Sequence, residues 1–425
     1  MSRPQLPALS FPAAILAACA CACTQARAQT DVATALPSSP LISGLTLGPV
    51  DFHPRASAGV VADDNILFTS ANKKSDLAWT FQSGMQAVVG DDAALIAYRD
   101  RNNDVLGLNP GGLIVQPPET WPGKIFMLDY APRFKYYDRY TAYDAVDEFG
   151  TLNFLWPMNR LILGLRQDYQ SQKALIIEAG NLATTETIST VLSAAYQIGD
   201  KTSLESDFRR ISTGYDLPNL IGYTEYNTED WFNYALTESM PVSLGVLAGY
   251  DDVAANQQNE TYEQLRARVR YTLTEKLTFD ASGGGEMREF QNGKADTLTP
   301  VFNVAGYYRP TERTSLSLNG YRQQYASILN GYNYTTTGAM LGVRQEMTDR
   351  FTADLNAGYY SLSYEAVTSP NPGYSDGYCT AQLGLDVKII RHLTGHLFYN
   401  LLNCQSHNAG DLNRNQIGLN VTLSY

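Results

Sequence analysis

The sequence has little of the charge and few of the motifs on which enzymes and nucleic-acid-binding proteins depend. Charged residues make up 17% of the 425 residues, histidine occurs four times, and the net charge is −12. An acidic chain does not neutralise phosphate, which argues against nucleic acid as a partner. We find neither a G-x-S-x-G elbow nor an H-E-x-x-H pair. We therefore expect no catalytic residues, no cofactor and no metal site.

Cysteine is also scarce, and three of the five cysteines lie within the first 23 residues. The other two, Cys379 and Cys404, are too few for a disulfide-rich scaffold. A disulfide between them is an alternative in an oxidising compartment. Against it, alternation places the two cysteines on opposite faces of neighbouring predicted strands. After the first 28 residues no apolar run approaches the roughly 18 residues that a spanning helix needs.

The first 28 residues have the pattern of an export signal. Arg3 precedes a small apolar stretch over residues 6–23, and residues 26–28 (ARA) form a cleavage site. Residues 16–19 (LAAC) also resemble a bacterial lipobox, so lipidation at Cys19 competes with cleavage after Ala28. Either route predicts that the chain leaves the cytoplasm.

Glycine (33) and tyrosine (28) are abundant instead, and apolar and polar residues alternate over long stretches. The last ten residues, QIGLNVTLSY, place Ile417, Leu419, Val421, Leu423 and Tyr425 on one face. Their polar or small neighbours fall on the other face, which predicts a strand with one apolar side. The length matches the roughly 9–11 residues of a tilted membrane-crossing strand. The same pattern recurs over residues 264–273 and 277–286.

Short turns alternate with long polar segments along the whole chain. The short turns lie at residues 156–159, 198–202, 237–241, 274–275, 309–313, 346–350 and 389–393. Short turns at one end and long loops at the other are typical of an outer-membrane barrel. We predict an all-β, closed, antiparallel, up-and-down transmembrane β-barrel of about 18 strands (16–20), with short periplasmic turns and long extracellular loops.

Closure follows from the cost of an open edge in hydrocarbon, where each unpaired backbone group costs several kcal/mol. The last predicted strand must therefore pair with the first. This would place Tyr425 at the periplasmic interface, where an amphipathic ring is stable. Tyrosines 196, 234, 271, 307 and 308 also fall beside short turns and could form the same girdle.

The expected domain plan is a signal peptide over 1–28, an N-terminal periplasmic segment over 29–49 and a barrel over 50–425. Residues 90–123 depart from this plan, because they form a long connection on the side where turns should be short. We interpret them as an inserted loop, since Pro117 and Pro118 would break a central strand. Two extra strands, at 93–99 and 112–116, or a partial plug in the lumen, remain alternatives.

Several segments resemble a known family of barrels. They are ASAGVVADDNILFTS (56–70), YRPTERTSLSLNGY (308–321) with its cognates YTLTEKLTFDASGG and VRQEMTDRFTADLNAGYY, and the closing NQIGLNVTLSY. Together they resemble the bacterial β-barrel porin family called type 2, which is related to barrels encoded with exopolysaccharide systems. The terminal aromatic, Tyr425, resembles the signal that the barrel assembly machinery reads. The resemblance implies a Gram-negative outer-membrane location but supplies no ligand residues.

The polar faces would line the interior. The candidate pore-lining residues are Arg266, Arg268 and Arg270 on one predicted strand and Asp280, Glu286 and Arg288 on the next. Opposite charges on neighbouring strands can pair, at roughly 0.2–1 kcal/mol each, which predicts an internally paired wall. The sharper hypothesis is that the arginine ladder biases permeation towards anions.

The sequence therefore favours a non-enzymatic, porin-like, passive channel for small polar solutes. A barrel for exopolysaccharide export or surface assembly with protein partners, or a structural outer-membrane protein, are the alternatives. The expected partners are outer-membrane lipid, lipopolysaccharide and the barrel assembly machinery. A homo-oligomer is a further alternative.

Overall fold

The protein is described by a computed structural model over residues 45–90, 123–176, 181–237, 239–254, 259–291, 294, 296–369, 372–407 and 410–425. The expected signal peptide, the alternative lipidation site and the competing interpretations of the 90–123 segment fall outside these residues.

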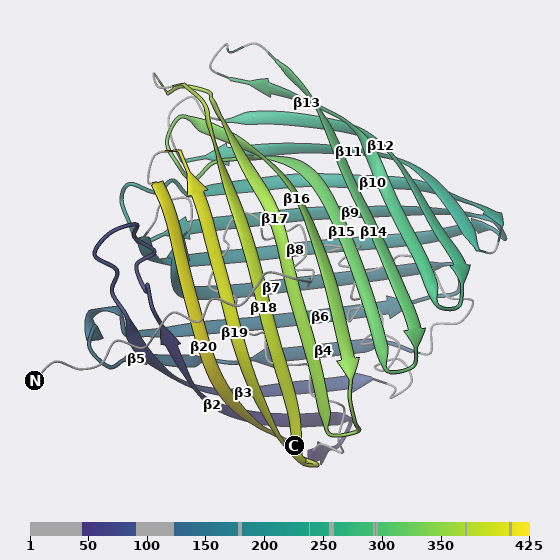
Figure 1. Ribbon diagram of the computed structural model, residues 1–425. Coiled ribbons are helices and arrows are strands. Elements are labelled where there is room, and N and C mark those ends of the chain that lie inside the picture. The colour runs from purple at the N-terminus through teal and green to yellow at the C-terminus, as the bar shows by residue number, and fades with distance from the viewer. Residues whose placement is uncertain are drawn as a thin grey trace, which may run out of the picture.

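The described chain is almost entirely β-strand (Figure 1). The strands are β1 (Leu45–Leu47), β2 (Val50–Asp63), β3 (Asp76–Gly90), β4 (Ile125–Tyr130), β5 (Arg133–Tyr137), β6 (Ala145–Pro157), β7 (Leu161–Ile176), β8 (Asn181–Gly199), β9 (Thr202–Tyr215), β10 (Tyr223–Thr237), β11 (Met240–Val253), β12 (Glu260–Thr274), β13 (Leu277–Phe290), β14 (Thr297–Thr311), β15 (Thr314–Ala326), β16 (Tyr332–Glu346), β17 (Phe351–Ala366), β18 (Tyr374–Ile390), β19 (Leu393–Ser406) and β20 (Gly410–Ser424). A single 3-10 turn, η1 (Thr141–Tyr143), is the one helical element of the described part. No helix in that part is long and apolar enough to cross a membrane.

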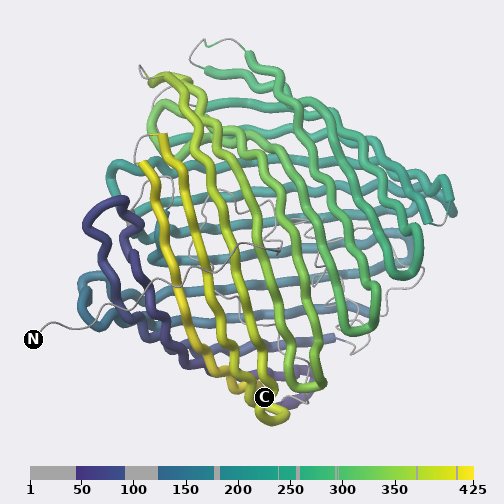
Figure 2. The backbone as a smooth tube through the Cα atoms, in the orientation of Figure 1, coloured from purple at the N-terminus to yellow at the C-terminus, as the bar shows by residue number. Residues whose placement is uncertain are grey.

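These 20 segments form an 18-strand antiparallel barrel, as predicted. β1 has three residues and pairs only with β2. β4 and β5 together occupy one strand position, because both pair with β3 on one side and with β6 on the other. The break between them falls at Pro132, which has no N–H to donate to a ladder. Figure 2 shows the remaining strands as one continuous meander.

The barrel closes between its first and last long strands, which confirms the predicted seam. β2 pairs with β20 from Arg55 opposite Ser424 to Asp63 opposite Gln416. The Tyr425 N–H donates to the Pro54 carbonyl at 3.0 Å. In Figure 1 the purple β2 and the yellow β20 lie side by side. Each of these two strands thus has a paired neighbour on both sides, which is the arrangement that the predicted membrane location requires.

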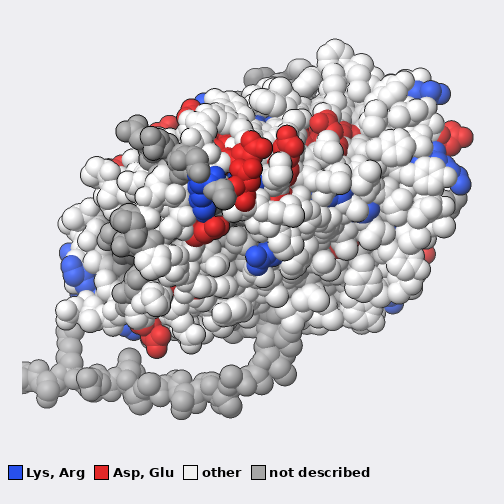
Figure 3. Space-filling view, turned by 90° about the horizontal axis from the view of Figure 1, so that it is seen from above, with Lys and Arg blue, Asp and Glu red and all other residues white. Residues whose placement is uncertain are grey.

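The distribution of apolar and polar residues on the two faces of the barrel wall is the reverse of that in a water-soluble protein. On β3, Leu77, Trp79 and Phe81 point outward and are 40–47% exposed, whereas Asp76 and Ala78, on either side of Leu77, are buried. The same alternation runs through the other long strands, with apolar residues outside and many polar residues buried inside. Most of the surface in Figure 3 is uncharged, and its charged side chains are gathered in groups. A period-two pattern on a closed sheet produces this arrangement.

The two ends of the barrel differ as expected. Hairpin turns such as Asp200–Lys201 and Glu275–Lys276 are short, whereas connections at the other end run over 64–75 and 216–222. Outward-facing tyrosines lie near the short turns and are 38–51% exposed: Tyr196, Tyr234, Tyr271, Tyr308 and Tyr425. Tyr307 belongs to the inward-facing set of β14, so it is not part of this girdle.

Gly284 of β13 lies very close to the backbone of the neighbouring strand β12. A Cβ at this position would lie 1.8 Å from the Leu265 carbonyl oxygen of β12. Only glycine permits this contact, and glycine within a barrel strand is typical of a position where the sheet bends.

Candidate functional site: the barrel interior

The arginine ladder of β12 faces inward, and each of its members meets a carboxylate. Arg266 Nη1 lies 2.9 Å from Glu229 Oε1 of β10. Arg268 Nη2 lies 2.9 Å from Glu205 Oε2 of β9. Arg270 Nε lies 3.0 Å from the carboxylate of Asp280 on β13, its cross-strand partner in the register. The ladder therefore carries little uncompensated charge into the lumen.

Trp231 of β10 lies under this ladder and fixes the orientation of two of its arginines. The guanidinium carbon of Arg268 is 4.4 Å from the centre of a Trp231 ring, and that of Arg266 is 5.4 Å away. The Trp231 indole N–H donates to Glu229 at 3.0 Å, and Glu229 also accepts from Arg266. Stacking and ion pairing thus hold these side chains against the wall.

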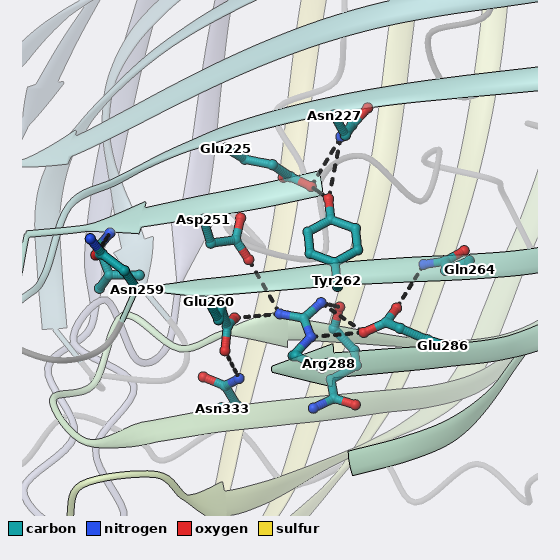
Figure 4. A network of polar contacts seen from close by, with 12 residues as sticks. Glu225, Asn227, Asp251, Asn259, Glu260, Tyr262, Gln264, Glu286, Arg288 and Asn333 are labelled. Carbon is teal, nitrogen blue, oxygen red and sulfur yellow. Dashed lines mark hydrogen bonds and ion pairs between the residues drawn. The ribbon is translucent and has the colours of Figure 1, made fainter. Parts of the chain in front are cut away.

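Arg288 of β13 is the centre of a second network nearer the long loops (Figure 4). It is 1% exposed, and the carboxylates of Asp251, Glu260 and Glu286 surround it. Arg288 Nη1 lies 3.2 Å from Asp251, and Arg288 Nη2 lies 2.8 Å from Glu286. The Tyr262 ring lies 4.5 Å from the guanidinium. One buried guanidinium therefore forms ion pairs with three buried carboxylates.

The Arg288 network extends across several strands of the wall. The Tyr262 hydroxyl donates to Glu225 of β10, and Gln264 donates to Glu286 at 2.6 Å. The Asn333 amide of β16 donates to Glu260, and Arg288 donates to the Gln324 carbonyl of β15 at 3.3 Å. These contacts tie β10, β12 and β13 to the strands that carry the 327–331 loop.

A cavity of about 150 Å³ lies against the inner wall on the short-turn side of the ladder. Its lining includes Lys201, Ser203, Asn233, Arg268 and Arg270. The Asn233 amide oxygen accepts hydrogen bonds from Arg268 at 2.9 Å and from Ser243 at 2.5 Å. This part of the interior is polar, and many of its groups are hydrogen-bonded to one another.

The long-loop end is different, because three loops converge there. The loop over 64–75 buries Phe68, the loop over 216–222 buries Leu220, and the loop over 327–331 buries Ile328. We call these three side chains, exposed by 1%, 7% and 1%, the loop plug. The Ile221 N–H donates to the Ile328 carbonyl at 3.0 Å, so loops from two separate hairpins are directly joined.

Two apolar clusters connect the loop plug to several strands of the wall. Leu220 and Ile328 pack with Ile176 and Ala183 of the β7–β8 hairpin. Phe68 belongs to a cluster that includes Leu175 together with Tyr334, Tyr360, Leu362, Tyr364, Tyr378, Cys404 and Leu412. Leu329 packs against both clusters. Apolar clusters therefore lie at this end beside the buried charges of the Arg288 network, whereas none of the buried side chains in these two clusters lies at the level of the arginine ladder.

Phe68 is held in a costly backbone conformation, with φ of +50°. A bulky residue rarely adopts such an angle unless the surrounding structure imposes it. Asn65 provides part of that constraint, because its side chain bonds the Thr69 carbonyl and N–H at 2.9 and 3.0 Å and the Asn413 carbonyl at 2.8 Å. The tip of this loop is thus preorganised to point inward.

Two cysteines and two histidines of β18, β19 and the turn between them occupy separate positions. Cys379 is exposed on the outer face, Cys404 is buried inside, and both are free thiols. His396 pairs with Asp386 at 2.7 Å, and the His392 ring stacks on Tyr425 at 5.2 Å. Within the described ranges, no group of three or more His, Cys, Asp or Glu residues could hold a metal ion.

Sequence reasoning predicted Asp280 but missed the loop plug and the other two carboxylates that pair with the arginine ladder, Glu205 and Glu229. The alternation of apolar and polar residues predicts which face of the sheet Glu205 and Glu229 occupy. It does not predict the strand register that places them beside the arginines of β12. The sequence does contain an indication of the loop plug. Apolar residues interrupt two otherwise polar loops, Leu217, Leu220 and Ile221 in one and Ile328 and Leu329 in the other. Apolar residues within polar loops often mark a buried tip or a contact surface.

Comparisons with known proteins give no match to a protein-family model and none to a curated protein. Solved structures do match in fold. OccAB4 of Acinetobacter baumannii is 8% identical with a TM-score of 0.47, covering 88% of this chain and 98% of its own. OpdK of Pseudomonas aeruginosa, solved with vanillate, is 11% identical with a TM-score of 0.44 over 88% and 99%. The siderophore receptor PirA of the same organism is 8% identical with a TM-score of 0.42 over 88% and 80%. At this level of similarity, function has to be argued from the chain's own geometry.

Proposed function

We propose that this protein is an outer-membrane β-barrel through which small polar solutes pass by diffusion, without catalysis. The observation that carries the proposal is the inversion of the wall, with an apolar outer face and a polar, charge-paired inner face on one closed sheet. Such a wall suits a membrane on the outside and water on the inside. A barrel of this strand number is wide enough for an aqueous channel unless inserted segments narrow it.

The loop plug determines when such a channel would be open. Its apolar side chains are buried between loops and wall at the long-loop end, where they would oppose the passage of water and ions, as hydrophobic constrictions do in other pores. Passage therefore requires the loops over 216–222 and 327–331 to separate. We propose that the structure represents the closed state, with the short-turn end facing the periplasm and the plug facing outward.

Planar-bilayer recording of the refolded mature chain tests this function. We compare the wild type with a Leu220→Asp/Ile328→Asp variant, in which two buried apolar contacts are replaced by carboxylates that repel each other. The variant should show stable conductance steps that are open for a larger fraction of the time than in the wild type. A correctly folded variant that inserts but never conducts would overturn the channel and favour export with partners or a structural role.

A further inference from the structure

The outer face of β10 carries a carboxylate at its centre. Asp230 is the middle residue of the 15 in β10. It shares the outer face with Tyr226, Phe232 and Tyr234, which are 37%, 46% and 40% exposed, while its neighbour Trp231 is 4% exposed on the inner face. The acidic group thus lies between two outward-facing tyrosines, at the depth where a membrane strand should be most apolar.

The immediate surroundings of Asp230 supply few partners. Thr228 Oγ1 donates to Asp230 Oδ2 at 3.3 Å, and Ser206 lies directly opposite on β9. We call Ser206, Thr228 and Asp230 the polar patch. Exposed apolar side chains on the same strands and on β11 surround it: Leu204, Phe208, Phe232, Leu244 and Val246. Lipid tails offer no hydrogen bonds, so an ionisable group at this depth is unfavourable unless another molecule provides them.

We propose that the polar patch is where a second copy of this chain binds side by side in the membrane. The patch combines an acceptor, the Asp230 carboxylate, with a hydroxyl donor, Ser206, directly opposite it on β9. A symmetry axis parallel to the membrane normal preserves depth, so the patch meets the same patch on the other copy. The Asp230 carboxylate of one protomer then accepts from the Ser206 hydroxyl of its partner. Small side chains at Ser206 and Thr228 allow the two walls to approach closely.

This proposal requires the barrel to lie in a membrane, but it does not require the barrel to conduct. Folding and insertion are read separately, from heat-modifiable mobility on gels, because a folded barrel migrates differently before and after boiling. Failure to fold into membranes would overturn the proposed function. A folded, membrane-inserted monomer would overturn only the present inference.

Cysteine cross-linking in native outer membranes provides the first test. Ser206→Cys is placed in a Cys379→Ser/Cys404→Ser background and oxidised. We expect a disulfide-linked dimer, because the symmetric contact brings the two copies of this position together. The wild-type thiol of Cys379 is the matched control, since it is also exposed on the outer face but lies on β18. Equal cross-linking at the two positions, or none at either, would contradict the proposal.

Substitution of Asp230 provides the second test, with oligomeric state read by native mass spectrometry in detergent. Asp230→Asn keeps a hydrogen-bond acceptor and should retain the dimer, whereas Asp230→Leu should lower the dimer fraction at least tenfold. Val304→Asp, on the outer face of β14, is the control for altering the lipid-facing surface and should leave the dimer intact. A monomeric wild type, or a dimer that Asp230→Leu does not weaken, would refute the contact.

Discussion

At the scale of single residues, the interior is governed by the cost of burying charge. Arg288 and its three acidic neighbours are each no more than 1% exposed. A buried ion pair contributes little net stability, but removing one partner leaves an uncompensated charge in a poorly hydrated site. Arg288 is therefore needed chiefly because Asp251, Glu260 and Glu286 are buried around it.

Replacing Arg288 by methionine should destabilise the barrel strongly. The three carboxylates would lose their common cation, and breaking a buried pair typically costs about 3–5 kcal/mol. The free energy of unfolding would be measured by urea titration in lipid vesicles. Arg313→Met is the matched control. The side chains of Arg313 and of its ion-pair partner Asp349 are 56% and 91% exposed, and water screens such pairs. Similar losses in the two variants would contradict this account of Arg288.

At the scale of elements, alternation predicted the strands well but said little about the loops. The pattern over 264–273 and 277–286 gave the faces of β12 and β13 correctly, because a period of two fixes which side each residue takes. It did not reveal that β4 and β5 share one strand position, where Pro132 interrupts the ladder. Nor did it show that three loops fold inward, since loop conformation depends on contacts between hairpins that are distant in sequence.

A disulfide across the loop plug should lock the channel. Ile221→Cys/Ile328→Cys, in a Cys379→Ser/Cys404→Ser background, joins two residues whose backbones are already hydrogen-bonded. In planar bilayers, oxidation should reduce the fraction of time that the channel is open, and reductant should restore it.

The matched control for this lock is Ser212→Cys/Thr224→Cys. It joins two side chains 3.1 Å apart across the β9–β10 hairpin, so it links neighbouring strands of one wall and leaves the loops free to part. If oxidation alters both variants equally, or alters neither, the loop plug is not the gate.

At the scale of the whole molecule, the closed barrel and its seam could be predicted from the sequence, whereas the partners inside it could not. The polar faces of the strands identified Arg266, Arg268, Arg270, Asp280, Glu286 and Arg288 as inward-facing candidates, and the structure places all six inside. Their role in permeation remains a prediction. The pairing with Glu205 and Glu229 depends on register and barrel curvature, which a single-strand pattern does not contain.

Charge pairing in the wall sets the expected ion selectivity. The triple variant Arg266→Gln/Arg268→Gln/Arg270→Gln leaves Glu229, Glu205 and Asp280 without their partners, so the reversal potential should shift towards cation selectivity. Arg322→Gln is the control, because Arg322 lies on the outward-facing side of β15 and bonds Thr337 there. An unchanged reversal potential in the triple variant would remove the arginine ladder from any role in permeation.

The central claim is that one closed sheet has hydrocarbon on its outer face and water on its inner face. Spin labels placed singly from Gln416 to Leu423 of β20, in a cysteine-free background, test it directly in lipid vesicles. We predict that collisions with oxygen peak at positions 417, 419, 421 and 423, and that collisions with a water-soluble nickel complex peak at 416, 418, 420 and 422. A profile without this alternation, or one that is water-accessible at every position, would contradict the account.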